Sequence, residues 1–160
     1  MKNLKNREIC IIGLGKEGVS AANYLGISNQ VTIYDDKPKI QINPDFLRNL
    51  KIKNIKLYFN KLPAQNFDYI VRSPGVRRDH PIVGKLVRNG SVLTSPTKIF
   101  FNECPAKIIG VTGTKGKGTT STLIHKMLKR MYKSVYLAGN IGTPALDILP
   151  KVTKDSLVVL

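Results

Sequence analysis

Two glycine-rich segments constrain the fold of this chain more than any other feature, because each separates a short apolar run from an amphipathic one. The first, GLGKEG at residues 13–18, follows EICII and precedes VSAANYL. The second, GTKGKGTT at residues 113–120, follows AKIIGVT and precedes STLIHKML. A β-branched run, then glycines, then a helical period is typical of a strand–loop–helix unit that holds phosphate at the start of its helix. The sequence therefore predicts two such units.

Strand-like and helix-like runs alternate along the rest of the chain. We expect further strands at residues 30–36, 55–59, 67–73 and 91–94, and helices that begin at Pro44, after the capping residue Asn43, and at Pro81. The pattern restarts near residue 98, with strands at 106–113, 134–140 and 155–160 and a helix at 119–133. This alternation predicts an α/β fold: a Rossmann-like parallel-sheet domain at 1–97, followed at 98–160 by the start of a P-loop α/β ATPase domain.

The charge balance favours a polyanionic ligand. Lysine and arginine number 26 against 10 aspartate and glutamate, a formal net charge of +16. The lysines are scattered, without an arginine block or interleaved aromatic residues, so the pattern suits a phosphate-rich small molecule better than nucleic acid. The apolar runs are too short for a membrane span or a signal peptide. We therefore expect a cytoplasmic protein with no membrane or nucleic-acid partner, in which Cys10 and Cys104 are buried thiols.

The second glycine loop predicts a binding site for ATP and Mg²⁺. Its backbone N–H groups, over the residues from Gly113 to Thr119, would surround phosphate oxygens at the helix start. Lys117 would reach the β- and γ-phosphates as the catalytic cation. The residue after this lysine is Gly118, so the hydroxyl that contacts Mg²⁺ must come from Thr119 or Thr120. The expected ATP-binding residues are Gly113, Thr114, Lys115, Gly116, Lys117, Gly118 and Thr119.

The first glycine loop by itself indicates only a diphosphate site. The spacing Gly-x-Gly-x-x-Gly is met by Gly13, Gly15 and Gly18, and a strand ending in Asp35-Asp36 follows at the distance where dinucleotide folds hold a ribose. Taken alone, this pattern favours an NAD-binding Rossmann dehydrogenase, which stays an alternative.

Five motifs in order give the chain a resemblance to the Mur ligase superfamily, the amide-forming ligases of peptidoglycan and polyglutamyl-folate synthesis. They are IIGLGKEGVSAANYL, YDDKP, SPGV followed by HP, GVTGTKGKGTT and AGNIGTPAL, and they span roughly residues 8–160. The chain departs from the usual ATP loop of that superfamily at Lys115, where Asn is common, and at Gly118, where Ser or Thr is frequent. GNIGTPAL is most similar to the branch that adds D-glutamate to UDP-N-acetylmuramoyl-L-alanine.

The resemblance implies that the first loop binds UDP rather than NAD. Lys16 and Glu17 would flank the diphosphate, and the residues Asp35, Asp36 and Lys37 would lie by the uridine. Ser73, Pro74 and Gly75 would line the same cleft, and Asn140 would reach the sugar diphosphate. The two loops would then hold two molecules, UDP-N-acetylmuramoyl-L-alanine and ATP.

The activity implied by the resemblance is ATP-dependent ligation of D-glutamate through an acyl phosphate, by a monomer. Residues that would complete the metal site and the third domain of such ligases lie beyond residue 160, so we expect a truncated chain that binds ligands without turnover. Two further alternatives stay open: a ligase similar to folylpolyglutamate synthase, and a basic nucleic-acid-binding P-loop module.

Overall fold

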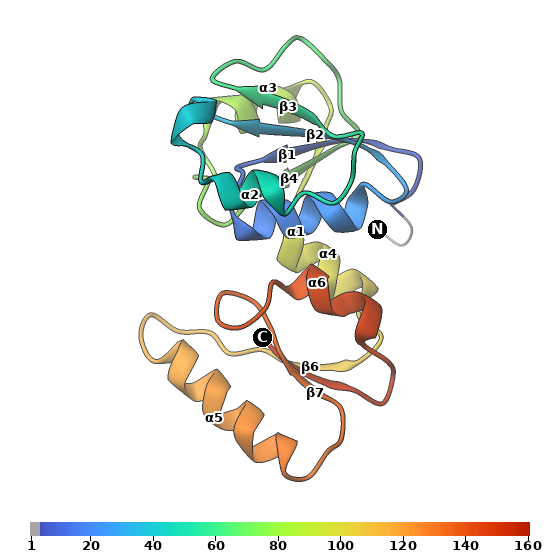
Figure 1. Cartoon of the computed structure of the whole chain (residues 1–160), viewed down its shortest axis with the longest axis vertical. Coiled ribbons are helices and arrows are strands. Elements are labelled where there is room, and N and C mark those ends of the chain that lie inside the picture. Colours follow the sequence, from blue (N-terminus) through green and yellow to red (C-terminus); the bar gives the residue numbers. More distant parts are fainter. Residues whose placement is uncertain (1–3) are drawn as a thin grey trace. The chain divides into compact units, whose positions relative to one another are not determined.

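Two separate β-sheets organise the chain. A computed structural model describes residues 4–160, which divide after Ile99 into two units. Each unit is an alternation of strands and helices around its own parallel sheet, as the sequence predicts (Figure 1).

The first unit contains a five-stranded parallel sheet in the order β3-β2-β1-β4-β5. Its elements are β1 (Glu8–Ile12), α1 (Lys16–Leu25), β2 (Gln30–Asp35), the 3₁₀ turn η1 (Lys39–Gln41), α2 (Pro44–Arg48), β3 (Lys56–Phe59), β4 (Tyr69–Arg72), α3 (Pro81–Arg88) and β5 (Val92–Thr94). From β1 the chain builds outward through β2 to β3, then returns to add β4 and β5 on the other side of β1. The strand order therefore reverses between β1 and β4, and this topological switch point is where open α/β sheets bind ligands.

Both faces of this sheet are buried, which explains the unbroken apolar run of β1. Cys10 and Ile12 face one way and pack in a cluster with Val83 and Leu86 of α3. Figure 1 shows α3 against one face and α1 and α2 against the other. Strands of a sheet that helices cover on both faces have continuous hydrophobic sequences. Burial raises the pKa of the Cys10 thiol to about 12, so this cysteine is the inert buried thiol that the sequence predicts.

The helix starts follow local capping chemistry. Asn43 caps α2 as predicted, with its side-chain oxygen accepting the N–H of Asp45 at 2.9 Å. At α3 the cap is His80, whose Nδ1 accepts the N–H of Ile82 at 3.2 Å. Each cap is followed by proline at the first helical position, where its fixed φ suits the helix and no N–H is needed.

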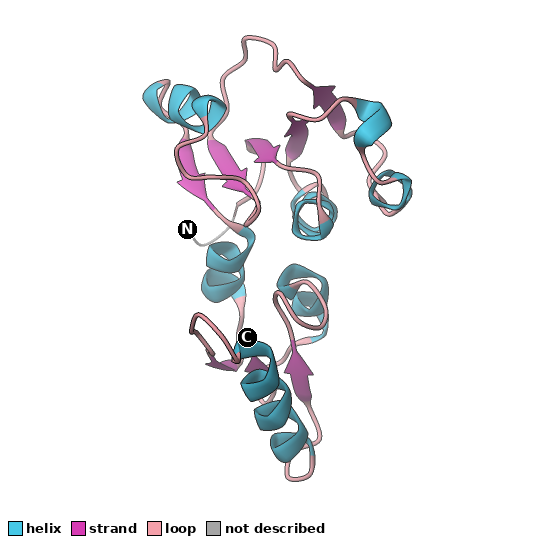
Figure 2. Ribbon diagram, turned by 90° about the vertical axis from the view of Figure 1, so that its left-hand side faces the viewer, coloured by secondary structure: helices cyan, strands magenta, loops and turns pink. Residues whose placement is uncertain are grey.

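The connection from β3 to β4 contains no helix. It runs from residue 60 to residue 68 as a loop, drawn in pink in Figure 2. The loop crosses to β4 on the sheet face that α3 covers, because Leu62 and Phe67 pack into the same cluster as Val83 and Leu86.

The second unit has a three-stranded parallel sheet in the order β6-β8-β7. Its elements are β6 (Lys107–Ile109), α5 (Lys117–Lys129), β7 (Val135–Leu137), α6 (Ala145–Ile148), the 3₁₀ turn η2 (Leu149–Lys151) and β8 (Leu157–Val159). α5 and α6 lie on opposite faces of the sheet (Figure 1). β6, the second glycine loop and α5 follow one another directly, so the loop has the strand before it and the helix after it that phosphate binding requires.

Three local features differ from the sequence-based expectation. The helix α4 (Pro96–Glu103) was not predicted, although Ser95 Oγ accepts the N–H of Lys98 at 3.2 Å and so caps it. The short helix α6 was also missed. α5 begins two residues before the expected start and ends at Lys129 rather than at residue 133.

The apolar positions of α5 do not all face inward. Ile124 and Leu128 are half-buried, whereas Leu123, Met127 and, just after the helix, Met131 are 54%, 59% and 77% exposed. The predicted single apolar face is therefore divided, because α5 packs on β7 and β8 through only one side of that face.

Candidate functional site

The first glycine loop lies at the carboxyl end of β1, beside the switch point of the sheet. Gly13 has a φ of +96°, which favours glycine, and its N–H donates to the carbonyl oxygen of Tyr34 on β2 at 2.8 Å. Gly15 is the N-cap of α1 and has no capping side chain. The loop therefore turns directly from β1 into the N-terminus of α1, where partial positive charge favours an anion.

The glycines of this loop are required for different reasons. A Cβ on Gly18 would lie 2.1 Å from the carbonyl oxygen of Gly13, so α1 and the loop touch through bare backbone. A Cβ on Gly15 would meet nothing within 4 Å. Gly18 is therefore needed for packing, while Gly15 leaves open space at the helix start, the place where a diphosphate approaches the backbone in dinucleotide folds.

Asp35, predicted to contact the nucleoside, holds the loop together in this structure. Its Oδ2 accepts the N–H of Leu14 at 2.7 Å, and its Oδ1 accepts the N–H of Lys37 at 3.0 Å. Both carboxylate oxygens are thus engaged with backbone. They fix the glycine loop to the end of β2.

Asp36, the next residue, is held by side chains. Tyr34 Oη donates to its Oδ1 at 2.6 Å, and His80 Nε2 lies 2.5 Å from its Oδ2. Burial raises the pKa of Asp36, but the hydrogen bonds from Tyr34 and His80, together with the electrostatic interaction with His80, outweigh it, so the pKa lies below its ordinary value of 3.8. Burial, followed by the hydrogen bond to Asp36, raises the pKa of Tyr34.

The segment that follows β4 closes the site from the other side of β1. Ser73 is buried; its N–H donates to the carbonyl oxygen of Ile12 at 3.0 Å, and its Oγ donates to the carbonyl oxygen of Gly13 at 2.8 Å. Arg72 donates from its guanidinium to the carbonyl oxygen of Val76 and so holds the turn. Pro74 and Gly75 form the exposed tip of that turn.

Eight of the nine predicted UDP-binding residues lie in this unit, at or just after the carboxyl ends of β1, β2 and β4. Lys16 is exposed and Glu17 half-buried in the first turn of α1, and Lys37 is exposed after β2. The ninth, Asn140, belongs to the second unit. It lies on the exposed loop after β7, which a bond from the Gly139 N–H to the Thr143 carbonyl oxygen closes at 2.9 Å.

The second glycine loop presents donors to solvent. Gly113 and Gly116 have φ values of +153° and +76°, and Gly116 is the left-handed N-cap of α5. Within residues 4–160, no acceptor holds the backbone N–H groups of Thr114, Lys115 and Gly116. Lys117 Nζ folds over the loop and donates to the carbonyl oxygen of Gly113. Outward N–H groups and a cation beside a helix N-terminus form a set of groups that suits phosphate.

The first turn of α5 contains the two predicted hydroxyl ligands and explains the unusual glycine. Thr119 and Thr120 are both exposed. At Gly118 a Cβ would lie 1.9 Å from Cδ1 of Ile141, so the isoleucine of the GNIG segment fills the space that a side chain at 118 would need. The chain thus departs from the usual ATP loop at two positions. Gly118 packs against Ile141, and Lys115 adds an exposed positive charge.

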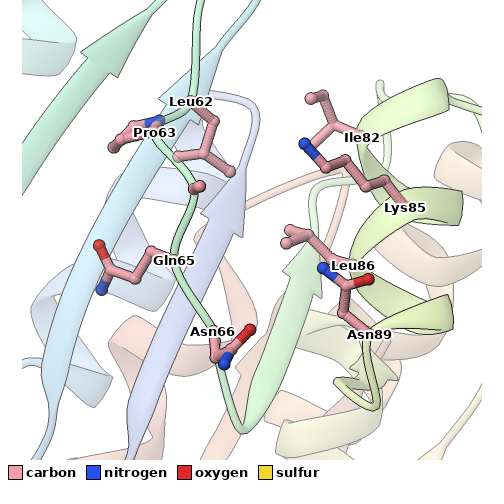
Figure 3. A pocket seen from close by; sticks show the side chains of 9 residues that line it. Leu62, Pro63, Gln65, Asn66, Ile82, Lys85, Leu86 and Asn89 are labelled. Atoms are coloured by element: carbon pink, nitrogen blue, oxygen red, sulfur yellow. The ribbon is translucent and has the colours of Figure 1, made fainter.

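Other site chemistry is limited in the part of the chain that the structure describes. Residues 4–160 hold no cluster of three or more His, Cys, Asp or Glu side chains arranged for a metal ion. None of the helices in that range has the length and apolar character to cross a bilayer. A pocket of about 420 Å³ lies between the β3–β4 loop and α3 (Figure 3), and its walls include Leu62, Ile82 and Leu86 but none of the predicted site residues.

His80 is a functional candidate for which the sequence predicts no role beyond its place before the helix expected at Pro81. It is a helix-start residue, as the cap of α3 shows, and it also contacts Asp36. The contact joins positions 44 residues apart. In the sequence, the pair His80-Pro81 after SPGV indicates a helix cap, but it does not indicate that His80 also contacts Asp36.

The fold and the two loops define a class: an α/β protein with a nucleotide-type glycine loop in each of two units. The profile of the MurD-like Mur ligase N-terminal domain matches residues 7–95, more than half of the chain. The chain belongs to this family of MurD-like Mur ligases.

Curated relatives match almost the whole chain. The UDP-N-acetylmuramoylalanine–D-glutamate ligase of Clostridium tetani is 36% identical over 99% of the chain, and that of Ruminiclostridium cellulolyticum is 35% identical over 99%. Each match covers 35% of the relative, so the chain spans about a third of the length of these proteins.

Solved structures have the same fold. The murein peptide ligase Mpl of Psychrobacter arcticus matches with a TM-score of 0.59 at 20% identity, over 96% of the chain and 37% of that protein. The UDP-N-acetylmuramate:L-alanyl-γ-D-glutamyl-meso-diaminopimelate ligase of Neisseria meningitidis gives 0.56 at 20% identity, over 96% and 52%. The predicted α/β class with a parallel sheet is confirmed.

Proposed function

We propose that this chain binds UDP-N-acetylmuramoyl-L-alanine and ATP for a ligase that adds D-glutamate in cytoplasmic peptidoglycan synthesis. In this proposal residues 1–97 form the substrate domain and residues 98–160 belong to the ATP-binding central domain of a monomer. The observation that carries the proposal is the GLGKEG loop at the switch point of the sheet, inside the segment that matches the MurD-like domain. The curated relatives' names supply the substrate and the amino acid.

The site residues divide between the two ligands. Lys16 and Glu17 at the start of α1 would flank the diphosphate, and Ser73, Pro74 and Gly75 would line the same cleft. Asp36 and Lys37 would lie by the uridine. Asp35 would act there chiefly by holding the loop, because its oxygens accept from Leu14 and Lys37. Asn140 would reach the sugar diphosphate.

The second loop supplies charge neutralisation for phosphoryl transfer. When bound, ATP provides the γ-phosphoryl group that activates the alanyl carboxylate as an acyl phosphate, and Mg²⁺ offsets the phosphate charge. Lys117 would leave the Gly113 carbonyl oxygen for the phosphates, and the N–H groups of the loop would surround them. Thr119 or Thr120 would contact the metal from the exposed first turn of α5. Lys115 would add a second cation.

Calorimetric titration of the 160-residue chain tests both sites. We expect binding of UDP-N-acetylmuramoyl-L-alanine in preference to NAD, and independent binding of ATP with Mg²⁺. Lys16→Ala should weaken UDP-sugar binding by about tenfold, the effect of one charge-assisted contact. Lys56→Ala is the matched control, because Lys56 is exposed at the opposite, amino end of β3.

A second pair of variants, one in the loop and one control, tests the ATP site of the second loop. Lys117→Met should weaken ATP binding at least about tenfold, whereas Lys133→Met, at an exposed position after α5, should leave it unchanged. Binding of NAD without a response to the UDP-sugar would refute the ligase assignment and favour the dehydrogenase. Oligonucleotide binding that weakens steeply with salt would favour the nucleic-acid module.

A further inference from the structure

One imidazole ring joins two elements of the first unit that are remote in sequence. His80 Nδ1 accepts the N–H of Ile82 at 3.2 Å and thereby caps α3. The opposite nitrogen, Nε2, lies 2.5 Å from Oδ2 of Asp36, just after β2. Because Nδ1 is an acceptor, the ring proton belongs on Nε2, which donates to the carboxylate. The His80 side chain is only 16% exposed, so the ring is fixed by packing as well as by its two bonds.

The contact determines how the Asp36 carboxylate is oriented. Tyr34 Oη holds Oδ1 at 2.6 Å, and a single donor leaves the carboxylate free to swing about that bond. His80 holds Oδ2, and two donors on two oxygens fix the carboxylate plane. The Asp36 side chain is still 57% exposed, so part of the fixed carboxylate faces solvent at the edge of the site. Asp79, beside His80, is a further charged neighbour, and it is paired with Arg77 at 2.6 Å.

The same contacts exclude an acid–base role for His80. One ring nitrogen is used by the backbone of α3 and the other by Asp36, so neither is directed at a ligand. The ring can act only through the groups that it holds.

We propose that His80 is a positioning residue for nucleoside recognition: through Nε2 it fixes the Asp36 carboxylate in the orientation that accepts hydrogen bonds from the uridine of the substrate. This inference rests on the proposed function of the first loop. A carboxylate fixed before binding avoids the loss of freedom that a mobile one would suffer on contact with the ligand.

Two substitutions separate the two contacts of the ring. In His80→Asn, the amide oxygen takes the place of Nδ1, so the α3 cap is kept while the contact with Asp36 is lost. In His80→Gln, the longer side chain places its amide nitrogen near the position of Nε2, so the donor to Asp36 is kept and the cap is lost. Asparagine is among the best capping residues, so His80→Asn should fold as stably as the parent chain.

Calorimetry with UDP-N-acetylmuramoyl-L-alanine and thermal unfolding are measured on the parent chain and both variants. We expect His80→Asn to raise Kd about five- to tenfold, the loss of roughly one well-placed polar contact, with Tm within about 2 °C. His80→Gln should keep Kd within about twofold and lower Tm by a few degrees. The Asp36 carboxyl pKa, followed by NMR, should rise in His80→Asn and not in His80→Gln.

The outcomes separate this inference from the proposed function. No UDP-sugar binding by the folded parent chain refutes both. Binding by the parent chain that is unchanged in His80→Asn overturns the positioning role and leaves the function standing. Equal losses of affinity and Tm in the two variants show a purely structural histidine and likewise overturn the inference.

Discussion

Replacement of Gly18 by alanine tests whether α1 is seated on the glycine loop by direct backbone contact. The added Cβ would lie 2.1 Å from the carbonyl oxygen of Gly13, 3.2 Å from its carbonyl carbon and 3.2 Å from Ser73 Oγ. Non-bonded carbon and oxygen atoms need more than 3 Å, so the helix start or the loop must move by about 1 Å. Neither is a flexible side-chain end. The N–H of Gly13 is hydrogen-bonded to the carbonyl oxygen of Tyr34. Ser73 donates hydrogen bonds to the carbonyl oxygens of Gly13 and Ile12.

The expected cost follows from two opposing effects. Overpacking against fixed backbone costs about 3 kcal/mol or more, at the upper end of the usual range. Alanine in place of glycine inside a helix stabilises the folded chain by about 1 kcal/mol. The net loss is about 2 kcal/mol, which corresponds to a Tm lower by about 4–8 °C for a chain of this size.

Gly15→Ala is the matched control, since its Cβ meets nothing within 4 Å and its φ of −112° suits alanine. We expect it to lose less than about 1 kcal/mol, the difference between glycine and alanine at an N-cap. Yet it should weaken UDP-sugar binding, because the methyl group enters the space left at the helix start. Urea unfolding by circular dichroism, with the amide signals of β1 followed by NMR, reports on the first unit separately. Equal stability of the two variants would refute the packing argument.

Two further predictions concern the second loop and the acidic turn after β2. Gly118→Ser should change the free energy of unfolding of the second unit by less than about 1 kcal/mol in urea unfolding, because the Cδ1 that its Cβ meets is the end of the Ile141 side chain, which is 46% exposed and can rotate away, and because serine is a better helix former than glycine; a loss of about 2 kcal/mol or more would contradict this. Because folding lowers the pKa of Asp36 from 3.8, the unfolded chain binds more protons than the folded chain in the acid range, so this contribution to stability is complete above about pH 5 and is lost as pH falls through the folded pKa. Asp36→Asn should flatten the acid limb of the curve of unfolding free energy against pH; an unchanged limb would exclude Asp36 as a contributor.

The sequence was sufficient for the order of the strands, for the helices α1, α2, α3 and α5, and for both glycine loops, because these depend on short-range patterns. The capping of α2 by Asn43 and the end of α1 at Gly26 are local signals of the same kind. α4 was missed although Ser95 and Pro96 mark its start, because only eight residues follow and the chain there was interpreted as a boundary. Which apolar residues of α5 are buried depends on the strands that the helix packs against. The spacing of apolar residues along the helix does not predict those strands.

The functional residues show the same division between local and long-range information. A strand ending in two aspartates predicts an acidic group at the sheet edge, and the structure places both there. What each carboxylate does is decided by remote partners: Leu14 for Asp35, His80 for Asp36. Those pairings follow from parallel strand register and from the return of the chain to β4, which one sequence does not specify.

The two glycine loops are built in opposite ways, and the difference fits the ligands proposed for them. The first is tied to its neighbours by Tyr34, Asp35 and Ser73, so the N–H groups of Gly13 and Leu14 and the carbonyl oxygen of Gly13 are already occupied. The second keeps the N–H groups of Thr114, Lys115 and Gly116 without acceptors, beside Lys117. A rigid loop with fewer donors suits a diphosphate that is esterified at both ends and needs orientation more than neutralisation. An open loop with two lysines suits the higher charge of a triphosphate, whose terminal phosphoryl group must leave after binding. Replacing Lys115 should therefore weaken ATP binding and leave UDP-sugar affinity unchanged, and calorimetry on Lys115→Met decides between this division of roles and a charge that acts on both ligands alike.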